Sequence, residues 1–281
     1  MELFTCLTRY INANISTFSD NQLSLHICTH RGKFSFSLHS LKSKQLLALV
    51  HYEIHSLAES FNFILSQIYE QEELLSFDYG KISYSVEDFK SSLIPTRFYT
   101  KESAESYLKL LYPLSEQEVL FKEELTKTKA YCISAISLSY QKALETHFPK
   151  ATFVSIYKKL IDNGQILIKS KKQVVHQAFI HLRKNHFDIL VFEYNELRFI
   201  NTYPCRSNND LLYFSLLLLN KLKIDLGALH LYLSGYVEGI NALEILENQV
   251  LNIEYCQAPP TKHISENVNF STYFTLIDLA E

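Results

Sequence analysis

The stretch QLSLHICTHRGKFSFSL, residues 22–38, decides the fold of the first half of the chain. Apolar and polar residues alternate through residues 23–30, stop at Gly32, and alternate again through residues 34–39. Period-two alternation on both sides of a tight turn is typical of a β-hairpin. The apolar run KQLLALVHYEI at residues 44–54 predicts a third strand beside it, although so short a run is also compatible with the start of a helix.

Helices and strands are expected to alternate through the rest of the first half. Ser56 and Glu59 have the spacing of a capping box, which predicts a helix from Ser56 to about Glu72 with its apolar stripe against the sheet. The remaining predictions are a strand at 81–86, a helix at 100–111, a strand at 130–138 and a helix at 139–147, which stops before Pro149 because a residue preceding proline avoids helical geometry.

The second half repeats this order of elements without repeating the sequence. The polar run Lys169–Lys172 connects the halves, and we expect two subdomains of order βββαβαβα, residues 1–150 and 151–281. The predictions for the second half are strands at 175–182, 188–192 and 197–203, a helix at 208–222 capped by Ser207, a strand at 229–234, a helix at 240–249, a strand at 251–255 and a closing helical piece, Ser271–Ala280.

The composition excludes several classes of protein. A chain of 281 residues with 47% hydrophobic and 20% charged residues is typical of a globular protein with more than one domain. Its six glycines do not form GxGxxG or GxxxxGK[ST], so neither a Rossmann nor a P-loop phosphate site is expected. The net charge of −3, with basic residues scattered singly, argues against nucleic acid as a partner.

The cysteines and the apolar segments indicate where the protein works. The five cysteines match no metal or redox motif and are expected to be reduced and buried, as in a cytoplasmic protein. The N-terminal segment MELFTCLTRYINANISTF lacks the pattern of a secretory signal, which also favours the cytoplasm. The most apolar stretch, residues 211–219, is far shorter than the ~20 residues of a membrane span, so we expect no membrane insertion.

Five segments carry a resemblance to a known family: HRGKFSFSL at 30–38, SSLIPTRFYTKESAESYL at 91–108, FDILVFEYNELRFINTYPCRSNNDLLYFSLLLLNKLKID at 187–225, HLYLSGYVEG at 230–239 and FSTYFTLIDL at 270–279. They resemble an uncharacterised Bacteroidetes family, a domain of unknown function with the actin-like ATPase fold of PilM and FtsA. The resemblance implies an α/β, duplicated, ribonuclease H-like fold, and a protein partner, because PilM and FtsA bind peptide segments of other proteins.

The same resemblance implies which residues an ATPase active site would need in this chain. ATPases of this fold place an acid-and-glycine hairpin turn of each half against the nucleotide phosphates. Here no acid precedes Gly32 in the first turn, the second turn has no glycine, and Asp188 lies beyond it. The adenosine loop reads Ser-Gly-Tyr around Gly235, without paired glycines. We therefore expect a pseudo-ATPase that neither hydrolyses ATP nor needs a cofactor.

Basic residues stand at both turns in place of the acids. If a small ligand binds, the resemblance implies an anion, although basic residues at hairpin tips are also common for solubility. The favoured function is a non-catalytic scaffold for a protein partner, and the alternative is a nucleotide- or anion-binding protein that uses the cleft between the halves. The candidate anion-binding residues are Arg31, Gly32, Lys33, Arg183, Lys184 and Gly235.

Other reactive residues are explained more simply by the fold. His26, Cys28 and His30 would share one face of a strand, but no fourth zinc ligand has a recognisable spacing. Residues 51, 55 and 59 (His, His, Glu) have the spacing of one helix face, but the predicted helix begins at Ser56, after both histidines. No metal is expected. Four acids could act as general acids or bases, although Ser207 and Asp210 are better read as a helix cap; the acids are Asp188, Glu193, Glu196 and Asp210.

Overall fold

The computed structural model of the chain describes residues 2–30, 32–56, 58–87, 90–169, 174–259, 264 and 268–279. These residues form two compact units. Unit 1 extends to Lys158 and includes Thr275–Leu279, and unit 2 runs from Lys159 to Phe274.

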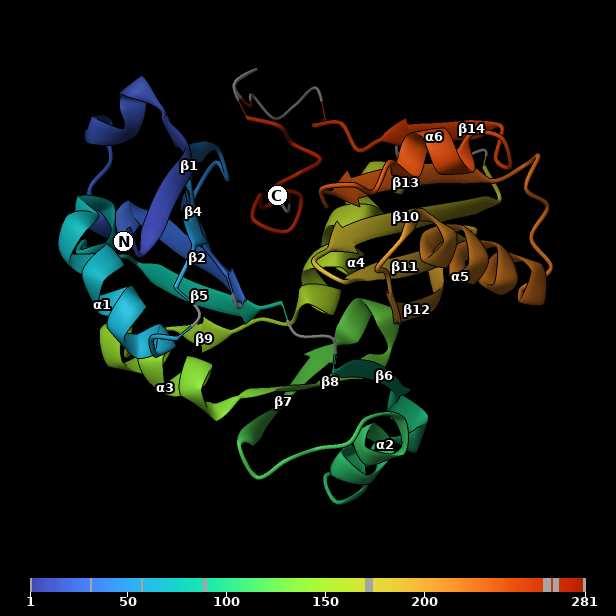
Figure 1. The fold of residues 1–281 in the computed structure, drawn as a ribbon, viewed down its shortest axis with the longest axis horizontal. Coiled ribbons are helices and arrows are strands. Elements are labelled where there is room, and N and C mark those ends of the chain that lie inside the picture. The colour runs from blue at the N-terminus through green and yellow to red at the C-terminus, as the bar shows by residue number, and fades with distance from the viewer. Residues whose placement is uncertain are drawn as a thin grey trace. The chain divides into compact units, whose positions relative to one another are not determined.

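The main sheet of unit 1 has six strands in the order β1-β4-β3-β2-β5-β9 (Figure 1). The expected hairpin and third strand are present as an antiparallel set, and β5 and β9 extend it in parallel with β2. The strands are β1 (Phe4–Ile11), β2 (Leu23–His30), β3 (Lys33–Ser40), β4 (Leu46–Ile54), β5 (Lys81–Val86) and β9 (Thr152–Phe153).

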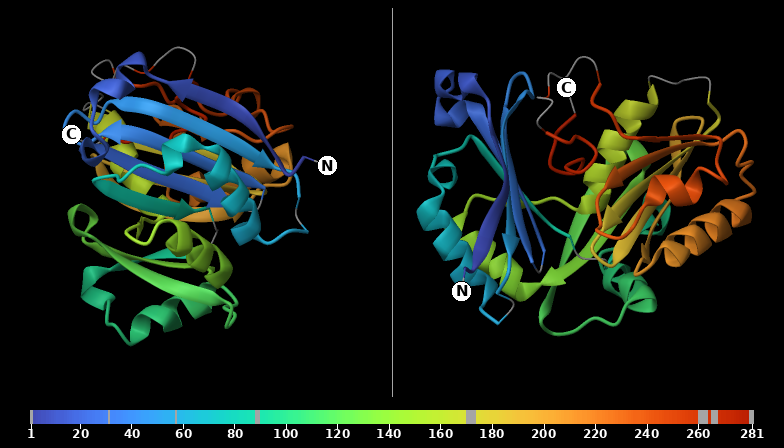
Figure 2. Two further views of the ribbon diagram at one scale, coloured as in Figure 1. Left: turned by 90° about the vertical axis from the view of Figure 1, so that its left-hand side faces the viewer. Right: turned by 45° about the horizontal axis from the view of Figure 1, so that its top comes forward.

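One face of this sheet forms the core of unit 1 with two helices, α1 (Phe61–Gln71) and α3 (Leu138–His147). Both lie on the same side of the sheet in Figures 1 and 2. Alternation along the strands gives this face its apolar residues, such as Phe36 and Leu38, and gives the opposite face, the second face, its serines and histidines, such as Ser37 and His39.

A small sheet lies between β5 and α3 in the sequence. Its order is β6-β8-β7, all antiparallel, and it packs with helix α2 around Ile94, Leu108 and Ile133. The elements are β6 (Ser91–Pro95), α2 (Ser103–Leu111), β7 (Glu118–Leu125) and β8 (Ala130–Ser137), and short 3-10 helices lie at Ala13–Thr17, Asp20–Gln22, Glu73–Leu75, Thr96–Phe98 and Thr126–Thr128.

Unit 2 repeats the topology with the sheet order β12-β11-β10-β13-β14, which corresponds to β4-β3-β2-β5-β9. In each unit a β-hairpin continues into a third antiparallel strand, and two further strands pair in parallel beside the first. This repeat is the predicted duplication. The strands are β10 (His176–Arg183), β11 (His186–Glu193), β12 (Glu196–Pro204), β13 (His230–Gly235) and β14 (Asn252–Tyr255).

Three helices cover the sheet of unit 2. Helices α5 (Asn208–Lys221) and α6 (Ala242–Leu246) pack on one face around Ile189 and Leu231. Helix α4 (Ile156–Ile168) packs on the second face, where Gly164 lies against Phe179 and Phe192. The predicted cap of α5 is confirmed, because the Ser207 hydroxyl accepts the Asp210 N–H at 3.2 Å.

Two predictions about helices are wrong. Helix α1 begins at Phe61, not at Ser56, because Ser60 caps it by accepting the Phe63 N–H at 3.3 Å. Ser56 instead lies just after β4, where its N–H donates to the Leu3 carbonyl at 3.4 Å. The closing piece Ser271–Ala280 forms turns rather than a helix over its described residues, and Ala280 lies outside them.

Five of the helices and strands described above were not predicted from the sequence. They are strands β1, β6, β7 and β9 and helix α4. Strand β1 is an edge strand paired only with β4, and its mixed exposure hides the alternation. Of the connector Lys169–Lys172, only Lys169 belongs to the described part of the chain.

Candidate functional site

The first candidate turn closes the β2–β3 hairpin at Gly32. Its φ of 98° lies in the region that glycine adopts without strain, and its carbonyl accepts the Ile54 N–H at 3.0 Å. The Thr29 hydroxyl donates to the Lys33 carbonyl at 2.7 Å across the turn. The predicted residue Arg31 lies outside the described residues.

Lys33 is held by a carboxylate that sequence analysis did not single out. Its Nζ lies 3.2 Å from Oε1 of Glu87, whose side chain is 4% exposed, and His30 Nε2 lies 3.6 Å from Oε2. The Cys28 thiol also donates to Glu87, at 3.3 Å. Glu87 directly follows β5, which runs parallel to β2, so the topology brings it beside the turn. Lys33 therefore carries a charge that Glu87 already neutralises.

His51 lies on the second face of the same sheet, on β4 opposite Ser35. Its Nδ1 is 2.6 Å from the Ser35 hydroxyl oxygen. Burial, reinforced by the positive charge of Lys33, lowers the pKa of His51 to about 4. The imidazole is therefore neutral at pH 7.

The second candidate turn closes the β10–β11 hairpin, and its arginine is buried. Arg183 Nε lies 2.7 Å from Asp188 Oδ2, and Nη2 lies 2.7 Å from Oδ1. The Thr202 hydroxyl donates to the same carboxylate at 2.5 Å. The two side chains are 5% and 0% exposed, so this ion pair belongs to the interior of unit 2. Lys184, at the tip, is exposed.

Gly235 is required by a close approach of two strands. It ends β13 opposite Leu182 of β10, with a φ of +74°, and a Cβ on it would lie 2.1 Å from the Leu182 carbonyl oxygen. Its N–H donates to the Ser271 carbonyl at 2.8 Å. The backbone donor expected at a phosphate or adenosine loop is thus used by the chain's own C-terminal segment, residues 268–279.

Different residues of this C-terminal segment belong to the two units. In unit 2, Phe274 stacks on Phe179 with ring centroids 6.4 Å apart, and its carbonyl accepts a hydrogen bond from Asn163 at 2.7 Å. In unit 1, the Ser37 hydroxyl donates to the Leu276 carbonyl at 2.6 Å. The segment is therefore part of the interior of each unit.

The metal-site alternatives find no support in the described residues. Within them, no group of three or more His, Cys, Asp or Glu side chains is arranged to hold a metal ion. His26 contacts the Ser83 hydroxyl instead, at 2.9 Å. Both histidines precede the helix, as predicted: His51 lies on β4, and His55, whose Nε2 is 2.8 Å from the Thr5 hydroxyl oxygen, follows that strand before α1 begins.

The five cysteines are in the thiol form, as expected, but not all are buried. Cys28, Cys132, Cys205 and Cys256 are buried, whereas Cys6 is exposed because it lies on edge strand β1. Burial raises the pKa of Cys132 and of Cys205 to about 11, so these thiols stay protonated.

Comparison with known proteins supports the fold and leaves the chemistry open. The profile of a family described as "Protein of unknown function (DUF3822)" matches residues 12–250. A protein from Bacteroides thetaiotaomicron, with the actin-like ATPase fold and unknown function, is 22% identical, with a TM-score of 0.77 over 92% of this chain and 96% of that one. No curated protein matches the sequence.

A second similar structure belongs to a protein complex. A chain of the PilM–PilN type IV pilus biogenesis complex is 11% identical, with a TM-score of 0.61 over 90% of this chain and 96% of that one. The predicted actin-like ATPase fold is confirmed by these two structures. Among the described residues, no helix is both long and apolar enough to cross a membrane.

Proposed function

The chain belongs to the DUF3822 family of proteins of unknown function, and within that family we propose that it is a non-catalytic scaffold with the actin-like fold that binds a protein partner. The observation that carries this proposal is the hydrogen bond from the Gly235 N–H to the Ser271 carbonyl. A nucleotide bound at this loop would need the Gly235 N–H as a donor, and the Ser271 carbonyl already accepts its hydrogen bond.

The two hairpin turns support the same proposal. An ATPase of this fold needs a carboxylate to hold the metal and free donors to hold the phosphates. Asp188 is bound by Arg183 in a buried pair, and Lys33 is bound by Glu87. Opening either pair for a ligand would leave a buried charge without its partner, which costs several kcal/mol.

A protein partner is supported by two observations. The PilM-like neighbour occurs in a complex with another protein. Helix α2 also exposes large apolar side chains, with Leu110 81% and Leu111 57% exposed and Tyr107 on the same side of the helix. Clustered exposed apolar residues are more typical of a protein-binding surface than of a solvated one.

The proposal places the protein in the cytoplasm. Five cysteines in the thiol form, including exposed Cys6, suit a reducing compartment. Nucleic acid is not proposed as a partner, since the net charge is −3 and the basic side chains at the turns are partly used in ion pairs.

The second candidate function, anion or nucleotide binding, rests on one observation. Lys184 is exposed at the tip of the second hairpin, where it is free to approach a phosphate, and it would act with Arg31, Gly32, Lys33, Arg183 and Gly235. This candidate requires that a ligand compete with the existing partners of Lys33 and Arg183.

Thermal unfolding separates the two functions. A ligand present at 100 times its dissociation constant stabilises the folded protein by about 2.7 kcal/mol. For the scaffold we expect no change in Tm with magnesium and ATP, ADP or GTP, or with phosphate, at millimolar concentrations. A rise in Tm that is lost in Lys184→Ala would establish the alternative instead.

The partner requires a direct binding measurement. Candidates captured from native cells are purified and titrated against the wild-type chain and against Leu110→Glu, with Lys150→Glu, an exposed change elsewhere in unit 1, as the control. The scaffold proposal expects a purified candidate to bind wild type and the control equally. Binding by no purified candidate would contradict it.

A further inference from the structure

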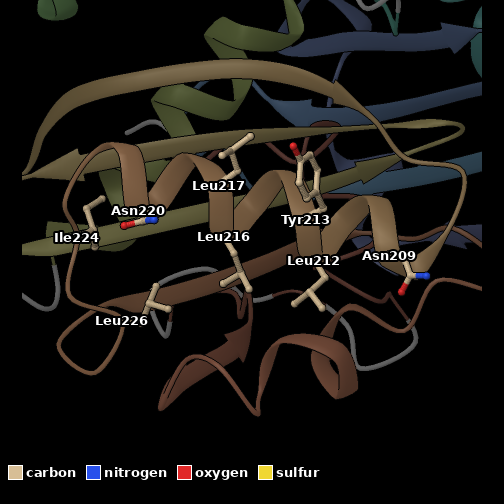
Figure 3. A pocket seen from close by; sticks show the side chains of 8 residues that line it. All are labelled: Asn209, Leu212, Tyr213, Leu216, Leu217, Asn220, Ile224 and Leu226. Atoms are coloured by element: carbon tan, nitrogen blue, oxygen red, sulfur yellow. The ribbon is translucent and has the colours of Figure 1, made fainter.

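Helix α5 lines an open apolar groove, where Leu212 and Leu226 also pack against the core of unit 2 (Figure 3). The groove has a volume of about 580 Å³. Leu211, Leu218 and Leu219 hold the helix to the sheet, whereas Tyr213 is 60% exposed. The helix thus has a second apolar face, formed by Asn209, Leu212, Tyr213, Leu216, Leu217 and Asn220.

The residues of this face form a nearly palindromic sequence along the helix. Asn209 and Asn220 stand at its two ends, Leu212 and Leu217 lie symmetrically inside them, and Tyr213 and Leu216 stand at the centre. Each of these three pairs has residue numbers that add to 429, so all three share one midpoint, between residues 214 and 215. None of the six side chains is charged.

We propose that this face binds a second copy of the chain, with the two α5 helices antiparallel about a twofold axis at that midpoint. An isologous interface must be complementary to itself, which means that each residue meets its symmetry counterpart. Antiparallel pairing places Asn209 against Asn220, Leu212 against Leu217 and Tyr213 against Leu216 of the other copy. Amides then meet amides, and apolar side chains meet apolar side chains.

The charges at the ends of α5 fit the same arrangement. Asp210 lies in the first turn of the helix and Lys221 in the last. In an antiparallel pair, each acidic end lies near the basic end of the other copy, and the two helix dipoles are opposed, which is favourable. A parallel pair would bring like charges together at both ends.

The apolar surface continues beyond the helix. Leu226 extends the groove past buried Ile224, and Leu251, 80% exposed, lies 3.9 Å from the position that a Cβ would take on Gly227. A specific interface buries roughly 800 Å² on each partner, so this extension brings the helix face closer to the area that a stable dimer needs. The proposal goes beyond the proposed function and does not depend on it.

The first test measures mass in solution. We expect the full-length wild-type chain to sediment with increasing concentration toward twice the monomer mass in equilibrium ultracentrifugation, and Leu216→Glu to remain monomeric over the same range. Leu7→Glu, at a 55% exposed position on β1, is the matched control and should dimerise as the wild type does. A monomeric wild type at all concentrations, or a dimer unaffected by Leu216→Glu, would overturn the proposal.

The second test reads the register and the direction of the helices. Cys6→Ser first removes the exposed native thiol. In that background, Asn209→Cys/Asn220→Cys should form an intermolecular disulfide on mild oxidation, whereas each single variant should not. The positions are exposed, so the substitutions leave the core unchanged. Cross-linking of a single variant would indicate parallel helices, and no cross-linking of the double variant would exclude the register; both results contradict the proposal.

Discussion

The guanidinium of Arg183 and the carboxylate of Asp188 form an ion pair in the interior of unit 2, with two N–O distances of 2.7 Å. The two residues lie five positions apart, on opposite sides of the hairpin turn, so their ion pair links the two strands beside the turn. The basic residue that resembled a ligand-binding group is thus a structural partner of the acid next to it.

Breaking this pair should be costly. Arg183→Ala leaves the Asp188 carboxylate buried without its counterion, and we expect the free energy of unfolding to fall by about 3–5 kcal/mol. Urea unfolding followed by circular dichroism measures the loss. The exposed neighbour Lys184→Ala should change stability by less than about 0.5 kcal/mol.

A double variant distinguishes the pair from simple loss of packing. Arg183→Met/Asp188→Leu removes both charges while filling the space, so it should recover most of the stability that Arg183→Ala loses. If the double variant is as unstable as Arg183→Ala, the cost does not come from the unpaired charge.

Gly235→Ala should prevent or severely impair the folding of unit 2. Its added Cβ would lie 2.1 Å from the Leu182 carbonyl oxygen, which no side-chain rotation relieves. Gly239→Ala is the matched control, because Gly239 has a similar φ of +78° but nothing within 4 Å of its Cβ position. The control should cost about 1–2 kcal/mol from backbone strain alone. Equal losses in the two variants, measured by urea unfolding, would contradict the steric explanation.

His51 should make the protein less stable as the pH falls below 6.5. The folded state holds the pKa of His51 at about 4, below its ordinary value of 6.5, so between these values the unfolded chain binds a proton that the folded chain does not. Stability from this group is complete above pH 6.5 and declines as the pH falls toward 4, by about 3 kcal/mol in total.

The measurement compares wild type with His51→Asn. Urea unfolding at pH 7, 5.5 and 4.5 should show a steeper loss for the wild type, because the variant lacks this titrating group. Carboxylates contribute equally to the pH dependence of the unfolding free energy in both proteins, so their contribution cancels when the two profiles are subtracted. Parallel pH profiles for the two proteins would show that His51 titrates alike in the folded and unfolded chains.

The C-terminal segment should contribute strongly to the stability of unit 1. Leu276 is 1% exposed, so Leu276→Ala is expected to cost about 2–5 kcal/mol through lost burial and the cavity left behind. Thr272→Ala, at a half-buried position in the part of the segment that belongs to unit 2, is the control and should cost far less. Hydrogen exchange of the β3 amides should accelerate in Leu276→Ala but not in the control.

The sequence predicted those elements whose local pattern agrees with their environment. The β2–β3 hairpin has one apolar and one polar face and a glycine at its turn, so its alternation survives in the fold. Strand β1 lies at an edge, where neither face is consistently buried, and it was missed. The start of α1 was misplaced because Ser56 and Ser60 are both capable caps, and only tertiary contacts show that Ser56 is held at the end of β4.

The candidate site was less predictable because its decisive partners are distant in sequence. Lys33 and Arg183 were identified as basic turn residues, but whether such a charge is free depends on what lies beside it. Glu87 reaches Lys33 across a separation of 54 residues. Ser271 reaches Gly235 through a backbone carbonyl, a group that every residue has and that no motif marks.

The bond from Ser37 to Leu276 has a consequence for how the chain matures during synthesis. It joins residues 239 positions apart, so the ribosome finishes the hairpin of unit 1 long before it makes the residues that cover its second face. At ~5–20 residues per second this delay lasts on the order of 10–50 seconds. During that time the serine- and histidine-rich surface of the nascent sheet faces water or a chaperone, and its polarity, unlike that of an exposed apolar sheet, protects it from aggregation while it waits.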